Sequence, residues 1–419
     1  MRRRNGGRFI IHILMWTEGP LPMTEATLLR PLLDAGERME QDLVDFRRDL
    51  HRNPELSLEE SETAAKVAAR LREYGYEVKT GVGGHGVVAE LAGDKPGKTI
   101  ALRADMDALP IQEESGVPFA SERSGVMHAC GHDAHTAILL GAARILMDHK
   151  NELEGNVRFL FQSAEEINQG ARMMIAEGAL EGVDEIYGLH NLPTLAAGKV
   201  ATRYGSLMGS VDRIEIALEG KGGHGAIPDQ SIDPVVAASA IVMGLQTAVS
   251  REISPFDPVV VTIGSLQAGD TYNVIPHRAS LVGTIRTFSP RVQASMKERI
   301  TRIAGQIAEA YRCKAEVTYT EMTPVLVSSD ECVAHVEQTV EAAIGTANRI
   351  EAAPTLAGED FSLYLQQVPG CFFWLGSGPE EGAERAYGLH HPKFTIEEAC
   401  LPLGASLLAA VALKRLSGG

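Results

Sequence analysis

The sequence predicts an α/β fold in which a mostly parallel, mixed sheet is flanked by helices and carries an inserted, smaller two-layer β-α-β-β-α-β domain. Three observations predict this architecture. Short apolar runs, typical of buried strands, alternate with helical patterns up to about residue 205. From residue 211 to residue 319 the order becomes strand, helix, strand, strand, helix, strand. After residue 333 the earlier alternation resumes.

The chain length supports more than one domain. Its 419 residues exceed the size at which a single hydrophobic core keeps growing. We expect the main domain at 24–205 and 321–419, with the inserted domain at 206–320. Residues 1–23 are expected to be a disordered leader, because the apolar run 9–16 after the arginines is short, contains His12 and lacks a cleavage pattern. Met1 and Met23 are both candidate starts.

The first predicted elements are helices. Apolar residues recur at three- and four-residue spacing from Thr24 to about Tyr74, with a break at 51–55 and a second helix at 61–73. Three apolar runs then predict strands at 76–79, 86–91 and 99–103. The following elements are an alanine-rich helix at 134–147, a strand at 156–161, a helix at 170–178 and a strand at 183–188.

The inserted domain begins with a strand at 211–218, in which apolar and polar residues alternate. It continues with a helix at 233–249, strands at 259–263 and 280–286, a helix at 293–311 and a strand at 314–319. This order predicts an antiparallel sheet. The main domain resumes with a helix at 333–344, a strand at 371–376 and a helix at 396–416.

Composition limits the classes of partner. The 44% hydrophobic, 22% charged and 5% aromatic fractions fit a soluble globular protein. A formal net charge of −16 argues against nucleic acids and anionic membranes, since both would be repelled. The five cysteines are odd in number and scattered, which indicates a reducing compartment, so we expect a cytoplasmic protein.

Acidic and imidazole side chains follow three of the predicted parallel strands. Asp105 and Asp107 follow the first, Glu165 and Glu166 the second, and His190 the third. Ligands of open α/β sheets bind at the carboxyl ends of strands. The aspartates alone are either a polar rim or part of a site, but the convergence of three strand ends indicates a site.

The stretch from Met127 to Thr136 contains three histidines, a cysteine and an aspartate. Cys130 and His132 bracket Gly131, whose missing side chain lets the thiolate and the imidazole turn toward one point. Such a pair suits Zn²⁺, Co²⁺, Mn²⁺ or Ni²⁺ rather than Ca²⁺. The alternative is an ordinary polar start to the helix that follows.

Seven motifs carry a family resemblance from about Val44 to the C-terminus. They are Arg103–Pro110, His128–Thr136, Gln162–Glu166, Gly188–His190, Gly220–Gly225, Gly358–Phe361 and Gly388–Pro392. Together they resemble the M20 metallopeptidase superfamily, in the amidohydrolase branch of N-acyl-amino-acid deacylases, hippurate hydrolases and auxin-conjugate hydrolases.

The resemblance implies a divalent metal site, with two ions per subunit, and an acid beside it. The implied ligands are Cys130, His132, Glu166, His190 and His390. Glu165 would be the general base toward a metal-activated water, and Asp107 would orient a ligand from behind. His391 is a near rival of His390, which directly follows the Gly-Leu pair as the family's ligand does.

This chain departs from many relatives at two positions. Asp105 stands where they have histidine, and Cys130 stands where they have an aspartate that bridges two metals. Both changes fit the amidohydrolase branch and leave the number and identity of the metals open.

The inserted domain adds candidate substrate ligands. His224 stands between glycines, and in relatives the matching histidine is lent across a dimer interface to stabilise the oxyanion. A role within its own chain, or a plain loop histidine, stays open. Asn273 and Arg286 match positions that hold the substrate's carboxylate, although Arg286 is also compatible with a surface strand charge. The resemblance implies a homodimer or a homotetramer.

The leading hypothesis is a metal-dependent amidohydrolase that cleaves N-acyl-L-amino acids, small molecules such as N-acetyl or N-benzoyl derivatives. A dipeptidase or carboxypeptidase of the same superfamily is the alternative enzyme. A catalytically silent metal-binding scaffold is the alternative from another class. Glu165 favours an enzyme, because a silent relative has no reason to keep an unligated acid beside Glu166.

Overall fold

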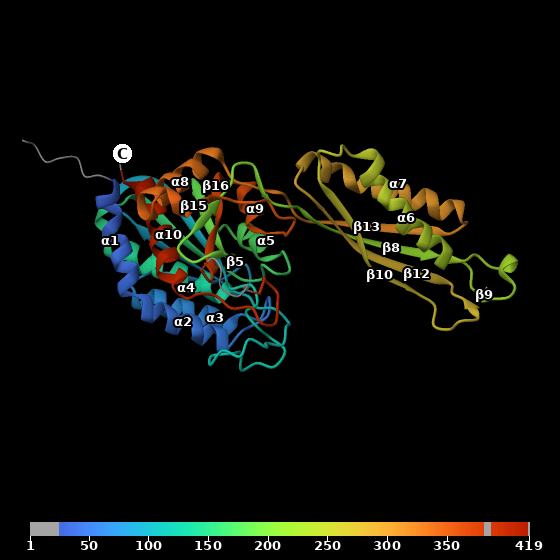
Figure 1. The fold of residues 1–419 in the computed structure, drawn as a ribbon, viewed down its shortest axis with the longest axis horizontal. Helices are drawn as coiled ribbons and strands as arrows, with labels where there is room; N and C mark the ends of the chain where they lie inside the picture. Colours follow the sequence, from blue (N-terminus) through green and yellow to red (C-terminus); the bar gives the residue numbers. More distant parts are fainter. Residues whose placement is uncertain (1–24, 381–386, 418–419) are drawn as a thin grey trace, which may run out of the picture.

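The computed structural model describes residues 25–380 and 387–417, and the leader predicted at 1–23 lies outside them. The polypeptide forms two parts, each around its own sheet, that lie side by side along the longest axis (Figure 1). We call the part with the eight-stranded sheet the large domain and the part with the four-stranded sheet the small domain.

The sheet of the large domain is mixed, as predicted. Its strands, in spatial order, are β1 (Val78–Val82), β2 (Gly86–Ala92), β4 (Glu154–Gln162), β3 (Lys95–Asp105), β5 (Glu185–Ala196), β16 (Gly370–Gly378), β6 (Val200–Thr202) and β15 (Arg349–Glu351). The central run β4-β3-β5-β16 is parallel. Their carboxyl ends therefore meet at one edge.

Helices cover both faces of this sheet. One face carries α1 (Glu25–Arg38), α2 (Glu40–Arg52), α3 (Ser61–Glu73), α4 (His132–Asp148), α8 (Asp330–Ile344) and α10 (Cys400–Leu416), and the other carries α5 (Gly170–Ala176) and α9 (Phe361–Leu365). Alternate residues of one strand pack into the hydrophobic cores on the two faces of the sheet, because successive side chains point to opposite faces. Ile100 and Leu102 of β3 pack on the first face, and Ala101 packs on the second.

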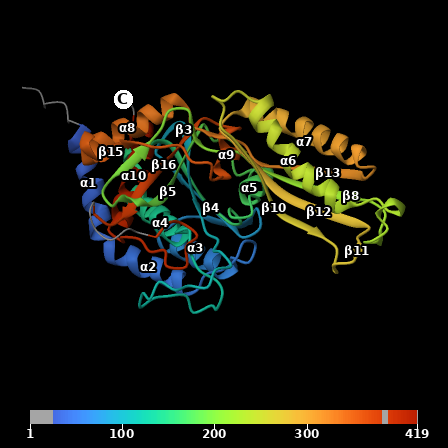
Figure 2. The same ribbon diagram turned by 45° about the vertical axis from the view of Figure 1, so that its right-hand side comes forward.

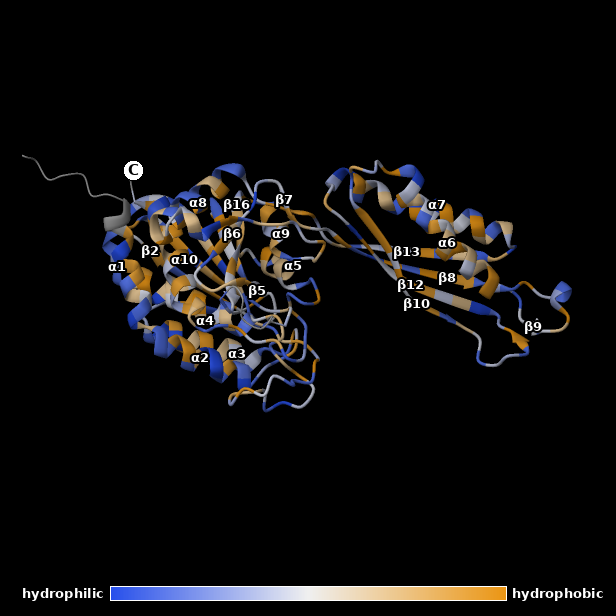
Figure 3. Cartoon of the chain, viewed as in Figure 1, coloured by the Kyte–Doolittle hydropathy of each residue, from blue (hydrophilic) through white to orange (hydrophobic). Residues whose placement is uncertain are grey.

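The small domain has the predicted element order. Its antiparallel sheet consists of β10 (Val259–Ala268), β12 (Arg278–Thr287), β8 (Val211–Glu219) and β13 (Lys314–Thr323), and α6 (Pro234–Glu252) and α7 (Pro290–Ala310) pack on one face. Apolar residues recur along these strands and helices in Figure 3. Asp233 and Ser289 cap the two helices by accepting hydrogen bonds from backbone amides, and a proline opens each helix.

Two short strand pairs complete the fold. β7 (Ser206–Met208) pairs with β14 (Leu326–Val327), where the chain passes between the two domains. β9 (Gly223–His224) pairs with β11 (Val274–Ile275), and this pair lies at the end of the small domain that is farther from the large sheet (Figures 1 and 2).

The structure differs from the prediction in several details. Helix α9 was not predicted, β1 lies two to three residues later than predicted, and β10 and β13 extend four or five residues past their predicted ends. The helical pattern from Thr24 is divided at Met39 into α1 and α2. The six strands of two or three residues were not predicted, because such runs are too short to show an alternation. β5 continues past the predicted end at 188, since β16 pairs with it from Ile186 as far as Ala196.

Helix α6 is long and apolar enough to cross a membrane by length and composition alone. Core helices of soluble proteins pass the same test. Here Ala237, Ile241, Leu245 and Ala248 of α6 are buried against the small domain's own sheet and α7, which accounts for the apolar composition of this face.

Candidate active site

The candidate site lies where the central strands of the large sheet end. β3 ends at Asp105, β4 ends just before the segment that carries Glu165 and Glu166, and β5 contains His190. Helix α4 starts beside them at His132. Three neighbouring strands and one helix terminus therefore bring distant parts of the sequence together.

The five predicted metal ligands form two groups of three donors that share Cys130. Cys130, His132 and His190 make one group, and Cys130, Glu166 and His390 make the other; the donor atoms of each lie within 4.8 Å of one another. Cys130 Sγ lies 3.3 Å from His190 Nε2, and Glu166 Oε1 lies 3.5 Å from His390 Nε2. The arrangement fits soft divalent cations.

Hydrogen bonds fix which nitrogen of each buried histidine faces this cluster. His190 Nδ1 donates to the carbonyl of Asn191 at 2.7 Å, and His132 Nδ1 donates to Asp107 Oδ1 at 3.1 Å. In the neutral rings, the form that binds a metal ion, both Nε2 atoms therefore carry the lone pair and face the cluster. A carboxylate or carbonyl behind a histidine is the usual way in which a metal-ligating imidazole is oriented.

Two buried donor atoms of the cluster support metal binding directly. His132 Nε2 and Glu166 Oε1 have no hydrogen-bond partner among the described residues. Burial alone would lower the pKa of His132, but Asp105, Asp107 and Glu166 raise it to about 10. An excess of negative charge around unpaired donors is the condition that a divalent cation satisfies.

Glu165 lies beside this cluster and is 7% exposed. Burial, together with Glu359 and Asp360, raises the pKa of its carboxyl group. Its Oε1 accepts a long hydrogen bond, 3.4 Å, from the Asp360 amide. One Glu165 oxygen also lies within 4.8 Å of donor atoms of His132 and Glu166. The Glu166 amide donates to Asp107 Oδ2 at 3.0 Å, so Asp107 holds the backbone next to Glu165.

A buried arginine supports the acidic residues, and sequence reasoning assigned it no role. Arg103 donates to Asp105 at 2.6 Å and to Asp360 at 2.8 Å, and its Nη2 lies 3.1 Å from Glu359. Asp105 in turn accepts from His135 Nδ1 at 2.6 Å. These residues stand in the quoted motifs, but a motif alone does not tell which member contacts which.

His390 and His391 have different surroundings. His390 has a left-handed backbone with φ of +64°, donates its amide to the Ala129 carbonyl and points Nε2 at Glu166. His391 stacks on Tyr387 and accepts from the Lys393 amide through Nδ1. The geometry favours His390 as the residue of this pair that joins the cluster.

The predicted substrate ligands are not gathered in one place. His224 and Asn273 lie together on the β9–β11 unit, where Gly225 donates to the Asn273 carbonyl at 2.8 Å. Arg286 lies near the other end of β12, and its Nη1 is 3.2 Å from the point that a Cβ on Gly358 would occupy. β12 separates the two groups by roughly 25 Å. Only Arg286 therefore lies near the large domain of its own chain.

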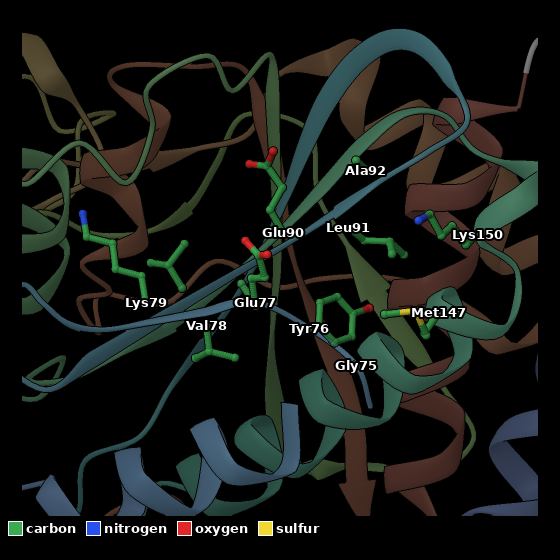
Figure 4. Close-up of a pocket in the computed structure, with 12 residues that line it drawn as sticks. Gly75, Tyr76, Glu77, Val78, Lys79, Glu90, Leu91, Ala92, Met147 and Lys150 are labelled. Carbon is green, nitrogen blue, oxygen red and sulfur yellow. The ribbon is translucent and has the colours of Figure 1, made fainter. Parts of the chain in front are cut away.

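A surface groove of about 750 Å³ lies elsewhere, over the edge strand β1 and its neighbour β2 (Figure 4). Its lining includes Tyr76, Glu77, Lys79 and Glu90. None of the predicted site residues contributes to it, so the candidate site is defined by its donor cluster rather than by this groove.

Comparison with known proteins agrees with this geometry. N-acetyl-L-cysteine deacetylase of Bacillus subtilis is 42% identical over 378 residues, which cover 90% of this chain and 89% of that protein. Thermostable carboxypeptidase 2 of Saccharolobus solfataricus is 40% identical over 391 residues, which cover 92% and 98%. The crystal structure of the Bacillus subtilis YXEP protein, described as a dinuclear metal binding peptidase from the M20 family, is 38% identical with a TM-score of 0.79 and covers 91% of this chain and 99% of that one.

The family model described as Peptidase family M20/M25/M40 matches residues 101–414, which contain every predicted metal ligand. The chain is a hydrolase that acts on amide bonds with divalent metal, and it belongs to peptidase family M20/M25/M40.

Proposed function

We propose that this enzyme cleaves the amide bond of N-acyl-L-amino acids to release a carboxylate and a free amino acid. The observation that carries the proposal is the shared donor cluster with Glu165 beside it. The similarity to N-acetyl-L-cysteine deacetylase supports an acyl amino acid as the substrate, and the similarity to a carboxypeptidase keeps a peptide substrate as the alternative.

We propose that Cys130, His132, Glu166, His190 and His390 hold two divalent ions, with Cys130 shared between them. Zn²⁺, Mn²⁺, Co²⁺ and Ni²⁺ all suit one thiolate, three imidazoles and a carboxylate. When bound, such ions lower the pKa of water and polarise a carbonyl oxygen. Asp107 keeps His132 oriented through the hydrogen bond to Nδ1.

Glu165 is the proposed general base. Its carboxylate takes a proton from the attacking water and later delivers it to the leaving amine nitrogen. Glu166 and Glu165 are neighbours in sequence but not equivalent, because Glu166 lies within reach of His390 whereas Glu165 lies against Glu359 and Asp360.

His224 is the proposed donor to the oxyanion that forms on the substrate carbonyl. Its Nδ1 accepts a hydrogen bond from the Ala226 amide at 3.0 Å, so in the neutral ring Nε2 carries the proton and is free to donate. His224 and Asn273 are remote from the donor cluster of their own chain, which supports their delivery by a second subunit.

In a homodimer or a homotetramer, one subunit could supply His224 and Asn273 to the donor cluster of another. Supporting features are the edge position of β10 and the exposed apolar side chains Val260, Leu266, Val236 and Met243 on β10 and α6.

Arg286, half-buried beside residue 358, is the proposed partner of the substrate carboxylate. A cytoplasmic location suits the five buried, unpaired cysteines.

The decisive experiment is Glu165→Gln. We expect turnover of N-acetyl and N-benzoyl amino acids to fall at least about a thousandfold, because the base is lost, while metal content stays near that of wild type. Metal analysis and initial rates with added Mn²⁺, Co²⁺ or Zn²⁺ measure both quantities. Glu77→Gln, in the groove over β1 and β2, is the control and should change neither.

Activity within tenfold of wild type in Glu165→Gln would exclude this base. A dipeptide panel measured in parallel tests the alternative, since a peptidase would prefer substrates with a free amino group to N-acyl ones.

A further inference from the structure

The residue before Glu165 has an unusual backbone. Ala164 is fully buried and has φ of +58°, in the left-handed region that side chains other than glycine rarely adopt. This conformation turns the chain sharply after β4 and sets the direction in which Glu165 leaves it. A strained backbone persists only where its surroundings hold it in place.

The surroundings hold both polar atoms of Ala164. Its carbonyl accepts from the amides of Gln169 and Gly170 at 3.2 and 3.0 Å. Its amide donates to Glu60 Oε1 at 2.8 Å. The carbonyl contacts come from the same loop, whereas Glu60 belongs to a segment more than a hundred positions earlier in the sequence.

Glu60 itself is placed in an unexpected environment for a carboxyl group. Its side chain is fully buried, and Oε2 has no hydrogen-bond partner within residues 25–380 and 387–417. Burial raises the pKa of this group to about 7. Retaining a buried acid with an unpaired oxygen is costly. The backbone groups that lower its pKa belong to Glu60 itself, Ala164 and Leu58, and of these only Ala164 lies in the loop that carries Glu165.

Capping of the nearby helix does not explain Glu60. Helix α3 follows it, but the orphan amides of the first turn, those of Glu62 and Thr63, donate to Glu55 at 3.2 and 2.7 Å. Glu55 is thus the structural acid of this segment, and Glu60 faces the loop that carries the base.

We propose that Glu60 is a positioning residue that holds the left-handed Ala164 and so aims Glu165 at the substrate. The inference rests on the proposed function, in which Glu165 is the base. Glu60 touches neither the donor cluster nor the substrate, so it should affect kcat rather than KM or metal content.

The test compares variants that keep or remove the hydrogen-bond acceptor. Glu60→Gln keeps an oxygen at Oε1 and should retain kcat within about threefold. Glu60→Met has a similar volume without an acceptor and should lower kcat about tenfold to a hundredfold, with KM and metal content near wild type, as for other residues that orient catalytic groups. Glu55→Gln and Glu55→Met are the matched control pair, and these two variants should have the same kcat.

A second substitution distinguishes positioning from general damage. Glycine adopts φ of +58° without strain. The double variant Glu60→Met with Ala164→Gly should therefore have a kcat at least about threefold higher than Glu60→Met alone. Arg312→Gly is the control, because Arg312 has φ of +63° but lies in the small domain, between α7 and β13, and it should restore nothing. Equal rescue by both glycines, or no loss in Glu60→Met, would overturn the proposal.

Hydrogen exchange provides a measurement that does not depend on turnover. The Ala164 amide should exchange faster in Glu60→Met than in wild type, and Glu55→Met should leave it unchanged. If wild type hydrolyses no substrate with any metal, the proposed function fails, while exchange still tests the contact. If wild type is active and the Ala164 amide stays protected in a folded Glu60→Met variant, the positioning role fails alone; Glu60→Ala repeats the test should the methionine prevent folding.

Discussion

At the scale of single residues, Gly131 links two of the proposed metal ligands, Cys130 and His132, through its backbone. It has φ of +89°, and a Cβ at this position would lie 2.3 Å from Asn191 Nδ2. Asn191 Nδ2 in turn donates to the Cys130 carbonyl at 2.6 Å. A side chain here would therefore displace the amide that holds the Cys130 backbone in place.

We predict that Gly131→Ala lowers both stability and metal content. The left-handed conformation alone costs an alanine about 1–2 kcal/mol, and the contact with Asn191 adds to it. Thermal unfolding and metal analysis measure the two effects.

Gly116→Ala serves as the control for backbone strain. Gly116 has φ of +76° with open space around its Cβ position, so this variant should lose stability but keep its metal. If Gly131→Ala binds metal as wild type does, the Asn191 contact has no influence on the cluster.

The clustering of the proposed donor residues was predictable because their types and spacings are chemically distinctive, as with Cys130 and His132 around a glycine. Glu60, Arg103 and Asn191 were not assigned a role. Each acts through a hydrogen bond to a residue far away in sequence, and a lone buried acid or amide carries no local pattern.

At the scale of elements, Glu185 joins two strands and the last helix. It stands at the start of β5 and accepts hydrogen bonds from Lys98 of β3, Tyr187 of β5 and Arg415 of α10. Burial alone would raise the pKa of Glu185, but the hydrogen bonds from Arg415, Lys98 and Tyr187 outweigh it and lower the pKa to about 2.

We predict that Glu185→Gln destabilises the fold in a pH-dependent way. Because the folded pKa lies below the ordinary value of 4.5, the contribution is fully present above pH 4.5 and is lost as the pH falls toward 2. At pH 7 the loss should be about 1–2 kcal/mol after allowance for solvent screening.

Urea unfolding at pH 7 and near pH 3 measures the difference in the free energy of unfolding between wild type and Glu185→Gln. This difference should be smaller at the lower pH. Glu154→Gln, which removes the partner of Lys95 in an exposed pair, should cost less than about 1 kcal/mol. A gap between wild type and Glu185→Gln that stays constant with pH would show that the carboxylate charge is not what stabilises this junction.

Long elements were predictable and short ones were not. α4 and β3 carry strong periodic patterns, and both match the prediction to within a few residues. β9 and β11 have two residues each and depend on pairing with each other. Their position decides where His224 lies, so the placement of this proposed site residue required the structure.

At the scale of the whole molecule, the proposed site needs groups from both ends of an elongated chain. His224 lies at the remote end of the small domain, and Glu165 lies in the large one (Figure 1). The order of elements in both domains was predictable, but their relative placement depends on the connection near β7 and β14, which has no periodic signal.

We predict that inactive His224→Ala and inactive Glu165→Gln subunits complement each other when mixed. Each alone should lose at least a hundredfold in kcat, the usual loss for an oxyanion donor or a base. In a dimer that exchanges His224, half of the assemblies are hybrids with one intact site, so about a quarter of wild-type activity should return.

Subunit exchange, verified by mass spectrometry of differently tagged chains, is the control for this mixture. Complete exchange without recovered activity would mean that His224 reaches Glu165 of its own chain through closure of the two domains.

Strands that are neighbours in the central sheet are also far apart in the sequence. β16 pairs with β5, yet the whole small domain is encoded between them, and His390 follows His190 by two hundred positions. A ribosome adding about 5–20 residues per second needs roughly 10–40 s to span that interval. During this time the nascent chain exposes the edge of β5, and of the two donor groups that share Cys130 it can assemble only the one with His132 and His190. On the proposed ligand set, an unfinished chain therefore lacks the second donor group, and its open strand edge is a site for unwanted strand pairing until the last segment emerges.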